Sequence, residues 1–305
     1  MSETPFVETD LYGFLAPDFV SPDRIAVKLE DLPARWPAQE TIGPTRVYDA
    51  RSVQAREESK GISEADFFEE HGFVLLSHES EVQDWDIDPS QPEMEQEAAR
   101  VYGPEAESLI RSRLLPGRKV EIQQGAPQRR GPGTATPFYA GAVHQDYGLR
   151  PEDFEESLEA FVAPEIVRGW RERFDQDDVA GFVLVNLWRP VSMQDPLMHM
   201  PLAVCEPRSV RVEDCVPLSL LEFGPTGRPT NQLALRRHPA QRWYYYPGMT
   251  GEEVLAFKNY QFFKDDSEAK VEACFHSAFE DPTAPAGAEE RQSCEHRVSV
   301  FVLRD

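Results

Sequence analysis

Short apolar runs separated by turn residues fill the second half of the chain. They fall at positions 202–205, 216–221, 232–236, 242–246, 254–257, 273–279 and 296–303. Such runs are typical of strands, and the glycine, proline and acidic residues between them mark turns. A series of short strands with turn signals between them predicts a β-sandwich or barrel.

The first half of the chain mixes helical periods with apolar runs. An amphipathic stretch ends at Gly72 and is followed by an apolar strand at 73–76. Positions 93–115 and 151–174 carry apolar side chains at helical spacing, and 179–188 is a continuous apolar run of the length of a buried strand. We therefore predict a β-rich α+β fold in which helices flank a β core.

We expect one large domain. The 305 residues include 40% hydrophobic ones, enough to bury a sizeable core. Residues 1–45 contain repeated prolines and no sustained period. They predict an extended N-terminal arm lying over a single jelly-roll domain at 46–305.

Charge narrows the range of partners. Acidic residues outnumber basic ones by 54 to 31, a formal net charge of −23. Such a surface repels phosphate backbones and anionic lipid, so we expect a small-molecule substrate and neither nucleic acid nor membrane as a partner. The chain begins without a signal-like segment, and no run approaches the roughly 20 apolar residues that span a bilayer. These features predict a soluble, cytoplasmic protein.

Metal chemistry is suggested by residues 138–147, which read F-Y-A-G-A-V-H-Q-D-Y. Neighbouring side chains of a strand alternate faces, so His144 and Asp146 of this β-prone run share one face. An imidazole and a carboxylate on one short edge are two corners of the two-histidine, one-carboxylate triad that holds iron(II) and leaves three positions open. The tripeptide alone arises by chance in many chains, so the hypothesis depends on a third ligand.

His276 is the predicted third ligand. A double-stranded β-helix, the jelly roll of cupin-like proteins, brings its first and second-to-last core strands side by side at an open mouth. The distal ligand of such a core lies on a β-run near the end of the chain, and His276 fits within A-C-F-H-S-A-F. His199 lies in a turn-like segment too early for this role, and His238 precedes a proline in a loop.

The last strand offers a site for an anion. Three open iron positions suit an oxo-acid co-substrate bound through two atoms, together with dioxygen, and a second carboxylate needs a fixed arginine. Residues of one parity on this strand are Arg291, Ser293, Glu295, Arg297 and Ser299. We expect Arg297 and Ser299 to hold the carboxylate, with Arg291 and Ser293 as second choice. A surface salt bridge through Glu295 is the alternative for either arginine.

Four other arginines are candidates for binding an anionic substrate. Arg129 and Arg130 belong to a loop rich in glycine and proline. We interpret them as a solvated basic pair, with an anion clamp as the alternative. Arg189 and Arg208 are candidates for holding a substrate carboxylate, although hydrogen bonding at the edge of the core is the more ordinary role for both.

Taken together, these residues resemble the iron(II)- and 2-oxoglutarate-dependent dioxygenases, specifically the hydroxylase/desaturase branch that includes cephamycin hydroxylation proteins and fungal secondary-metabolite oxidases. The blocks that carry the resemblance are, in order, Y-D-A-R, H-G-F-V-L-L, V-H-Q-D-Y, N-L-W-R-P, P-L-A-V-C-E, R-W-Y-Y-Y-P-G-M-T-G-E-E-V-L-A-F-K, F-H-S-A-F-E-D-P and R-Q-S-C-E-H-R. The chain departs from the expected pattern at Glu206, where an aspartate is expected, and in the stretch F-F-K-D-D-S-E-A-K.

The resemblance implies that His144, Asp146 and His276 bind iron(II) and that an arginine of the terminal block anchors 2-oxoglutarate, with dioxygen as oxidant. It implies attack on an unactivated C–H bond of a small amino-acid-like or secondary-metabolite substrate. Hydroxylation, desaturation and oxidative cyclisation such as aziridine formation are the outcomes it allows. Two alternatives remain open: a cupin-like iron oxygenase that does not use 2-oxoglutarate, and a non-catalytic jelly-roll binding protein.

Overall fold

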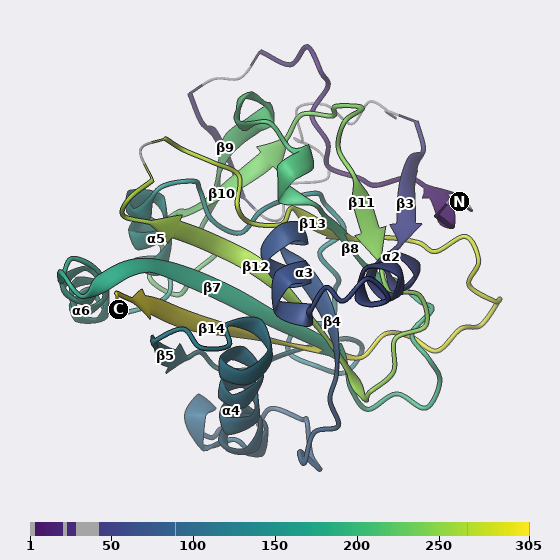
Figure 1. Cartoon of the computed structure of the whole chain (residues 1–305), viewed down its shortest axis with the longest axis horizontal. Helices are drawn as coiled ribbons and strands as arrows, with labels where there is room; N and C mark the ends of the chain where they lie inside the picture. The colour runs from purple at the N-terminus through teal and green to yellow at the C-terminus, as the bar shows by residue number, and fades with distance from the viewer. Residues whose placement is uncertain (1–3, 21–22, 29–42, 89, 267, 305) are drawn as a thin grey trace.

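The computed structural model of the chain describes residues 4–20, 23–28, 43–88, 90–266 and 268–304 (Figure 1). Its largest sheet has the strand order β4-β12-β7-β14-β5, and β6 also pairs with β14. The bounds are Phe73–Ser77 for β4, Glu253–Phe263 for β12, Val179–Pro190 for β7, Ser293–Leu303 for β14, Val120–Gln124 for β5 and Gln128–Arg130 for β6. Nearly all of β7 is buried, because it lies between two long neighbours and is covered on both faces.

The other strands form two smaller sheets, with the orders β1-β3-β11-β8-β13 and β10-β9-β2. Their bounds are Phe6–Thr9 for β1, Thr45–Asp49 for β3, Trp243–Tyr245 for β11, Leu202–Cys205 for β8, His276–Ala278 for β13, Thr230–Leu235 for β10, Cys215–Leu221 for β9 and Ile25–Lys28 for β2. The two sheets are joined through residues 142–145, because His144 pairs with His276 of β13 and Gln145 pairs with Leu233 of β10.

The segment 138–147 is not the regular strand that the sequence predicted. It forms only isolated bridges, because successive residues hydrogen-bond to strands of different sheets. The alternation of faces is kept locally. His144 and Asp146 both line a cavity, whereas Gln145 is buried elsewhere.

Five α-helices accompany the sheets in the described chain: α2 (Ala50–Glu58), α3 (Glu64–His71), α4 (Glu97–Leu109), α5 (Pro151–Leu158) and α6 (Pro164–Phe174), with short helical turns at η2 (Glu93–Glu95), η3 (Ile110–Leu114), η4 (Pro207–Ser209) and η5 (Val212–Asp214). Buried residues of α3 and α4 pack with one face of β7, and those of α5 and α6 pack with the other. None of the described helices has both the length and the apolar composition needed to cross a bilayer.

The described part of residues 1–45 is built into the smaller sheets, whereas the sequence predicted an arm lying over the body. β1 pairs with β3, and β2 pairs with β9. Leu11, Phe14 and Leu15 between these strands are buried. Each of the two strands is only four residues long, which is too short to produce a periodic signal. Residues 1–3, 21–22 and 29–42 of the predicted arm lie outside the described residues.

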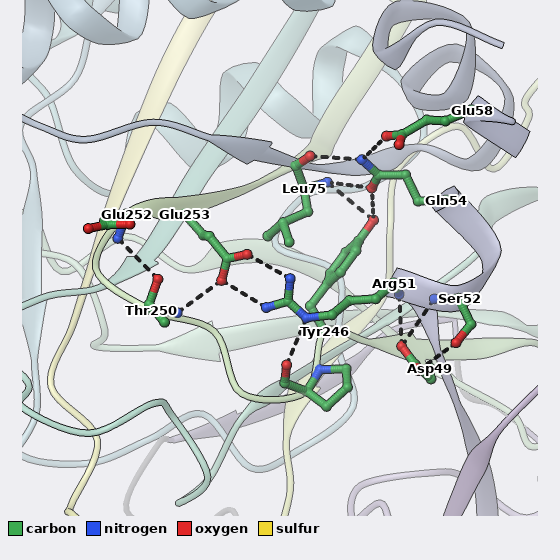
Figure 2. A network of polar contacts seen from close by, with 11 residues as sticks. Asp49, Arg51, Ser52, Gln54, Glu58, Leu75, Tyr246, Thr250, Glu252 and Glu253 are labelled. Carbon is green, nitrogen blue, oxygen red and sulfur yellow. Dashed lines mark hydrogen bonds and ion pairs between the residues drawn. The ribbon is translucent and has the colours of Figure 1, made fainter. Parts of the chain in front are cut away.

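A polar network holds helix α2 against the edge of the large sheet (Figure 2). The guanidinium of Arg51 binds both carboxylate oxygens of Glu253, at 2.6 and 2.8 Å. The side chain of Gln54 exchanges hydrogen bonds with the backbone of Leu75 in β4, at 2.9 and 3.0 Å, and accepts one from the Tyr246 hydroxyl at 2.7 Å. These contacts connect α2 to β4, to β12 and to the segment that follows β11.

Candidate metal centre

Three predicted metal ligands meet at one point. One ligand atom from each of His144, Asp146 and His276 lies within 4.8 Å of the others. The backbones of His144 and His276 exchange two hydrogen bonds, with N···O distances of 3.2 and 2.9 Å. This bridge to β13 places side chains from distant parts of the sequence side by side.

Both imidazoles are oriented by backbone carbonyls. His144 Nδ1 lies 2.7 Å from Ala142 O, and His276 Nδ1 lies 3.2 Å from Cys274 O. When Nδ1–H donates to a carbonyl, the lone pair of the neutral ring is on Nε2. In each neutral histidine the candidate ligand atom is therefore Nε2.

The two carboxylate oxygens of Asp146 have different surroundings. Oδ2 accepts hydrogen bonds from Asn259 Nδ2 at 3.0 Å and from Arg297 Nη2 at 2.9 Å. Oδ1 lies 3.3 Å from His144 Nε2. The carboxylate is thus held through one oxygen, and the other faces the imidazole nitrogen.

Two of the three candidate ligands, Asp146 and His276, are in the charge states that bind a cation. Burial, together with the neighbouring His144 ring, lowers the pKa of His276 to about 4. Burial alone would raise the pKa of Asp146, but Arg297 and the His144 hydrogen bond outweigh it and hold that pKa well below its usual value. Burial lowers the pKa of His144, but Asp146 outweighs this effect and the net shift is upward. At neutral pH, Asp146 is ionised and His276 is neutral, as metal ligands must be.

The three ligands line a cavity of about 600 Å³, a size that suits a small organic ligand. The large sheet contributes Trp188 of β7 and Phe257 of β12 to its wall. The smaller sheets contribute Leu218 of β9 and Gln232 of β10. The cavity therefore lies between the large sheet and the smaller ones.

Two arginines of the terminal block line this cavity in different electrostatic states. Arg297 pairs with Asp146 at 2.9 Å and lies 3.5 Å from Glu295, so its positive charge is already neutralised by carboxylates. Arg291 is only 2% exposed, donates to a backbone carbonyl and lies 4.1 Å from the ring centroid of Tyr139. Burial lowers the pKa of Arg291 to about 10. No carboxylate of the described chain pairs with Arg291, which leaves its charge available to an anionic ligand.

The remaining predicted residues are spread over the molecule. Ser293 Oγ is buried without a hydrogen-bond partner in the described residues. Ser299 lies further along β14 and is not part of the described cavity wall. Arg189 is buried over two aromatic rings, and Arg208, whose side chain is 62% exposed, pairs with a surface glutamate. The structure does not bring Arg189 or Arg208 to the cavity.

The interpretation of Arg129 and Arg130 as a solvated pair is wrong. Arg129 is 7% exposed, and the side chain of Arg130 is 17% exposed. Both lie on β6, which pairs with β14 and is covered by its surroundings. Arg130 lines the cavity and donates to Glu295 at 2.7 Å.

Sequence reasoning missed Asn259 and the aromatic residues Phe161 and Phe223 of the cavity wall. Asn259 sits inside the apolar run of β12, and a lone amide among buried residues is its only signal. Phe161 lies just after α5, and Phe223 lies just after β9. Nothing in the sequence distinguishes them from other apolar residues, and only the folded chain brings them to the cavity wall.

Comparison with known proteins finds relatives of the kind that the motif blocks resemble, the hydroxylase/desaturases and 2-oxoglutarate-dependent dioxygenases. A model of the oxidoreductase/YMDC permease-like domain matches residues 27–301. A hydroxylase/desaturase, CTB9, from Cercospora beticola is 34% identical over 127 residues, which are 39% of this chain and 37% of the relative. The Fe(II)/2-oxoglutarate-dependent dioxygenase nvfI from Aspergillus novofumigatus is 31% identical over 121 residues, 39% of this chain and 41% of the relative. These matches span less than half the length of either relative.

A solved structure extends the likeness over the whole chain. The iron and alpha-ketoglutarate-dependent endoperoxidase NvfI superposes with a TM-score of 0.63 over 99% of this chain and 100% of its own, at 22% identity. At that identity the likeness establishes a shared fold. The chain therefore belongs to the oxidoreductase/YMDC permease-like domain family, and its homologues are the hydroxylase/desaturases and Fe(II)/2-oxoglutarate-dependent dioxygenases that its motif blocks predicted.

Proposed function

We propose that the protein is an Fe(II)- and 2-oxoglutarate-dependent oxygenase in which His144, Asp146 and His276 hold the iron. One observation carries this proposal: two imidazole nitrogens and one carboxylate oxygen lie within 4.8 Å of one another at the wall of a cavity. That donor set suits non-haem iron(II) and leaves three positions open. The names of the relatives support the same reading.

We propose that Arg291, with Ser293, holds the distal carboxylate of 2-oxoglutarate. This reverses the order of preference taken from the sequence. Carboxylates already match the charge of Arg297, whereas Arg291 is a buried cation with no carboxylate partner in the described chain. Ser293 Oγ is also buried without a partner, and a buried hydroxyl needs one. An arginine and a hydroxyl together suit a carboxylate.

The bound iron, with 2-oxoglutarate and dioxygen, supplies the oxidising chemistry that attacks an unactivated C–H bond. The protein binds and orients the reactants. Backbone carbonyls fix the imidazoles of His144 and His276, and Asn259 and Arg297 fix Asp146. Phe257, whose ring centroid lies 5.1 Å from that of His276, gives the cavity wall an apolar side chain beside the candidate ligands.

The arrangement of the three sheets is that of an oxygenase core in this proposal. We propose that the sheets form a double-stranded β-helix, or jelly roll, and that residues 46–305 form a single domain whose smaller sheets are extended by strands β1 and β2 of the N-terminal segment. Two observations support this assignment. A cavity lies between the large sheet and the smaller ones, and the candidate ligands His144 and His276 lie on paired chain segments at its wall. The homologues' names, hydroxylase/desaturase and endoperoxidase, fit a site that accepts different outcomes on a small substrate: hydroxylation, desaturation or oxidative cyclisation.

Succinate production tests this function. Protein loaded anaerobically with Fe(II) is given 2-oxoglutarate, dioxygen and ascorbate, which supplies the electrons that a substrate would otherwise give, and succinate is measured for the wild type and for His144→Ala. We expect iron-dependent succinate from the wild type and none above background from the variant. No iron-dependent succinate from the wild type would contradict the use of 2-oxoglutarate and favour the cupin-like alternative, and iron content unchanged in His144→Ala would contradict the metal assignment.

A further inference from the structure

The cavity carries more positive than negative charge, although the chain as a whole is strongly acidic. Among the described residues that line it, the cations are Arg130, Arg291 and Arg297, and the anions are Asp146 and Glu295. The lining therefore has a formal charge of +1, in a chain whose formal net charge is −23. A local excess of this sign inside an acidic protein suggests a binding role.

The proposed metal and co-substrate leave this excess unchanged. Iron(II) adds two positive charges and 2-oxoglutarate adds two negative ones, so the loaded site keeps a formal charge of +1. An unmatched charge in a cavity partly shielded from water is costly. The loaded site therefore favours an occupant with one negative charge.

Arg130 is placed to meet that charge. Its Nε and Nη2 both donate to one oxygen of Glu295, at 3.1 and 2.7 Å. The same oxygen lies 3.5 Å from Arg297, so two guanidinium groups share a single carboxylate. Within the described chain, Arg130 Nη1 has no hydrogen-bond partner, and the side chain is 17% exposed.

The position of Arg130 sets the distance of an anion from the metal. Arg297 contacts both Asp146 and Glu295, and Glu295 contacts Arg130. Arg130 thus lies along one wall, separated from the metal ligand by two side chains. An anionic group bound there leaves the rest of the molecule free to lie across the metal.

Aromatic side chains line the outer part of the cavity. Phe138, Phe161 and Phe223 line it and are 47%, 44% and 39% exposed. Phe161 and Phe223 pack edge to face with centroids 5.9 Å apart, and the Arg130 guanidinium lies 5.9 Å from the centroid of Phe138. Large exposed apolar side chains gathered at a cavity favour an apolar ligand.

We propose that this site, working as the oxygenase proposed above, takes an apolar substrate that carries one carboxylate, and that Arg130 binds the carboxylate. The aromatic residues Phe138, Phe161 and Phe223 contact the apolar body. A free amino acid is a zwitterion without net charge and does not match the excess charge of the site. The substrate class is therefore an apolar carboxylic acid whose nitrogen, where present, is uncharged.

Matched acids and amides test this proposal. Anaerobic protein loaded with Fe(II) and 2-oxoglutarate is titrated calorimetrically with 4-phenylbutyrate and 4-phenylbutanamide, and with N-acetyl-L-phenylalanine and its primary amide. We expect each acid to bind about 10- to 100-fold more tightly than its amide, as a charge-assisted hydrogen bond implies. L-Phenylalanine, the zwitterion, is expected to bind more weakly than its N-acetyl derivative.

Variants test whether Arg130 is the residue that causes the preference for the acid over the amide. In Arg130→Gln the ratio of acid to amide affinity is expected to fall close to one, and Arg130→Lys is expected to keep an intermediate ratio. Arg228→Gln, which removes an exposed cation outside the described cavity wall, is the matched control and is expected to keep the wild-type ratio. Affinity for 2-oxoglutarate is measured on the same samples and is expected to change in Arg291→Gln but not in Arg130→Gln.

Equal wild-type affinity for acid and amide, an unchanged ratio in Arg130→Gln, or no binding of either acid at millimolar concentration would overturn the substrate proposal. The wild-type ratio remains decisive if Arg130→Gln does not fold. Failure of the wild type to bind 2-oxoglutarate would overturn the proposed function instead, so the two failures are distinguishable.

Discussion

At the scale of single residues, the metal site depends on how Asp146 is held. Asn259 and Arg297 both donate to Oδ2, and Oδ1 remains beside the His144 imidazole. Partners of this kind orient a ligand before the metal arrives and so reduce the cost of binding. Arg297 also carries a charge that repels a cation, so its removal would mix two opposed effects. Asn259 is neutral and reports the orientation effect alone.

Asn259→Ala is expected to weaken binding of Co(II) to the metal-free protein by about 10-fold or more, because the Asp146 carboxylate loses one of its two fixed donors. Chelator competition measures the affinity. Gln261→Ala, on the same strand but hydrogen-bonded to Glu272, is the control and is expected to bind as the wild type does. Equal affinity in the two variants would show that Asn259 does not position the ligand.

At the scale of elements, the sequence predicted those strands that consist of one short apolar run bounded by turn residues. The apolar run 202–205 matches β8, and Gly72 ends α3 in the left-handed conformation, with a φ of 80°. β12 continues to Phe263, well past the predicted 254–257, and β14 begins at Ser293, before the predicted 296–303, because polar residues such as Gln261 and Glu295 are paired with β7 inside the fold. Which residues pair is a property of tertiary contacts, and a single sequence does not contain it.

Gly72→Ala tests the junction between α3 and β4. An added Cβ would lie 2.8 Å from Pro207 Cγ and 3.1 Å from Cys274 Sγ, in addition to the strain of a positive φ. Gly61→Ala has a φ of 88° and no atom within 4 Å, so it carries the strain alone. Urea unfolding is expected to show about 1–3 kcal/mol more destabilisation in Gly72→Ala than in Gly61→Ala. Equal losses would mean that the junction is loosely packed.

At the scale of the whole molecule, the candidate site is assembled from the middle of the chain and from its C-terminal part. Its candidate ligands come from the segment 144–146 and from β13, and its arginines come from β6, from β14 and from the residues just before β14. The sequence predicted the ligands because their residue types and order are distinctive. It preferred Arg297 to Arg291 for the anion site, whereas we propose Arg291, because parity along a strand does not reveal which cation already has a carboxylate beside it.

Arg51→Ala tests whether α2 is part of the same cooperative unit as the large sheet. The variant loses a two-point ion pair with Glu253, and we expect a loss of about 1–3 kcal/mol in the free energy of unfolding, with a single transition retained. Arg56→Ala, on the exposed face of the same helix, is expected to change it by about 0.5 kcal/mol or less. A separate early transition in Arg51→Ala would indicate that α2 unfolds independently of the sheet.

The central claim is that His144, Asp146 and His276 hold iron(II) where Arg291 can anchor 2-oxoglutarate. Anaerobic titration of the metal-free protein with Fe(II) in the presence of 2-oxoglutarate, followed by the charge-transfer absorption of the complex, tests it most directly. We predict one iron per chain with a 2-oxoglutarate-dependent band in the wild type, a weaker affinity for 2-oxoglutarate in Arg291→Gln and no band in His276→Ala. An undiminished band and iron stoichiometry in His276→Ala would contradict the account.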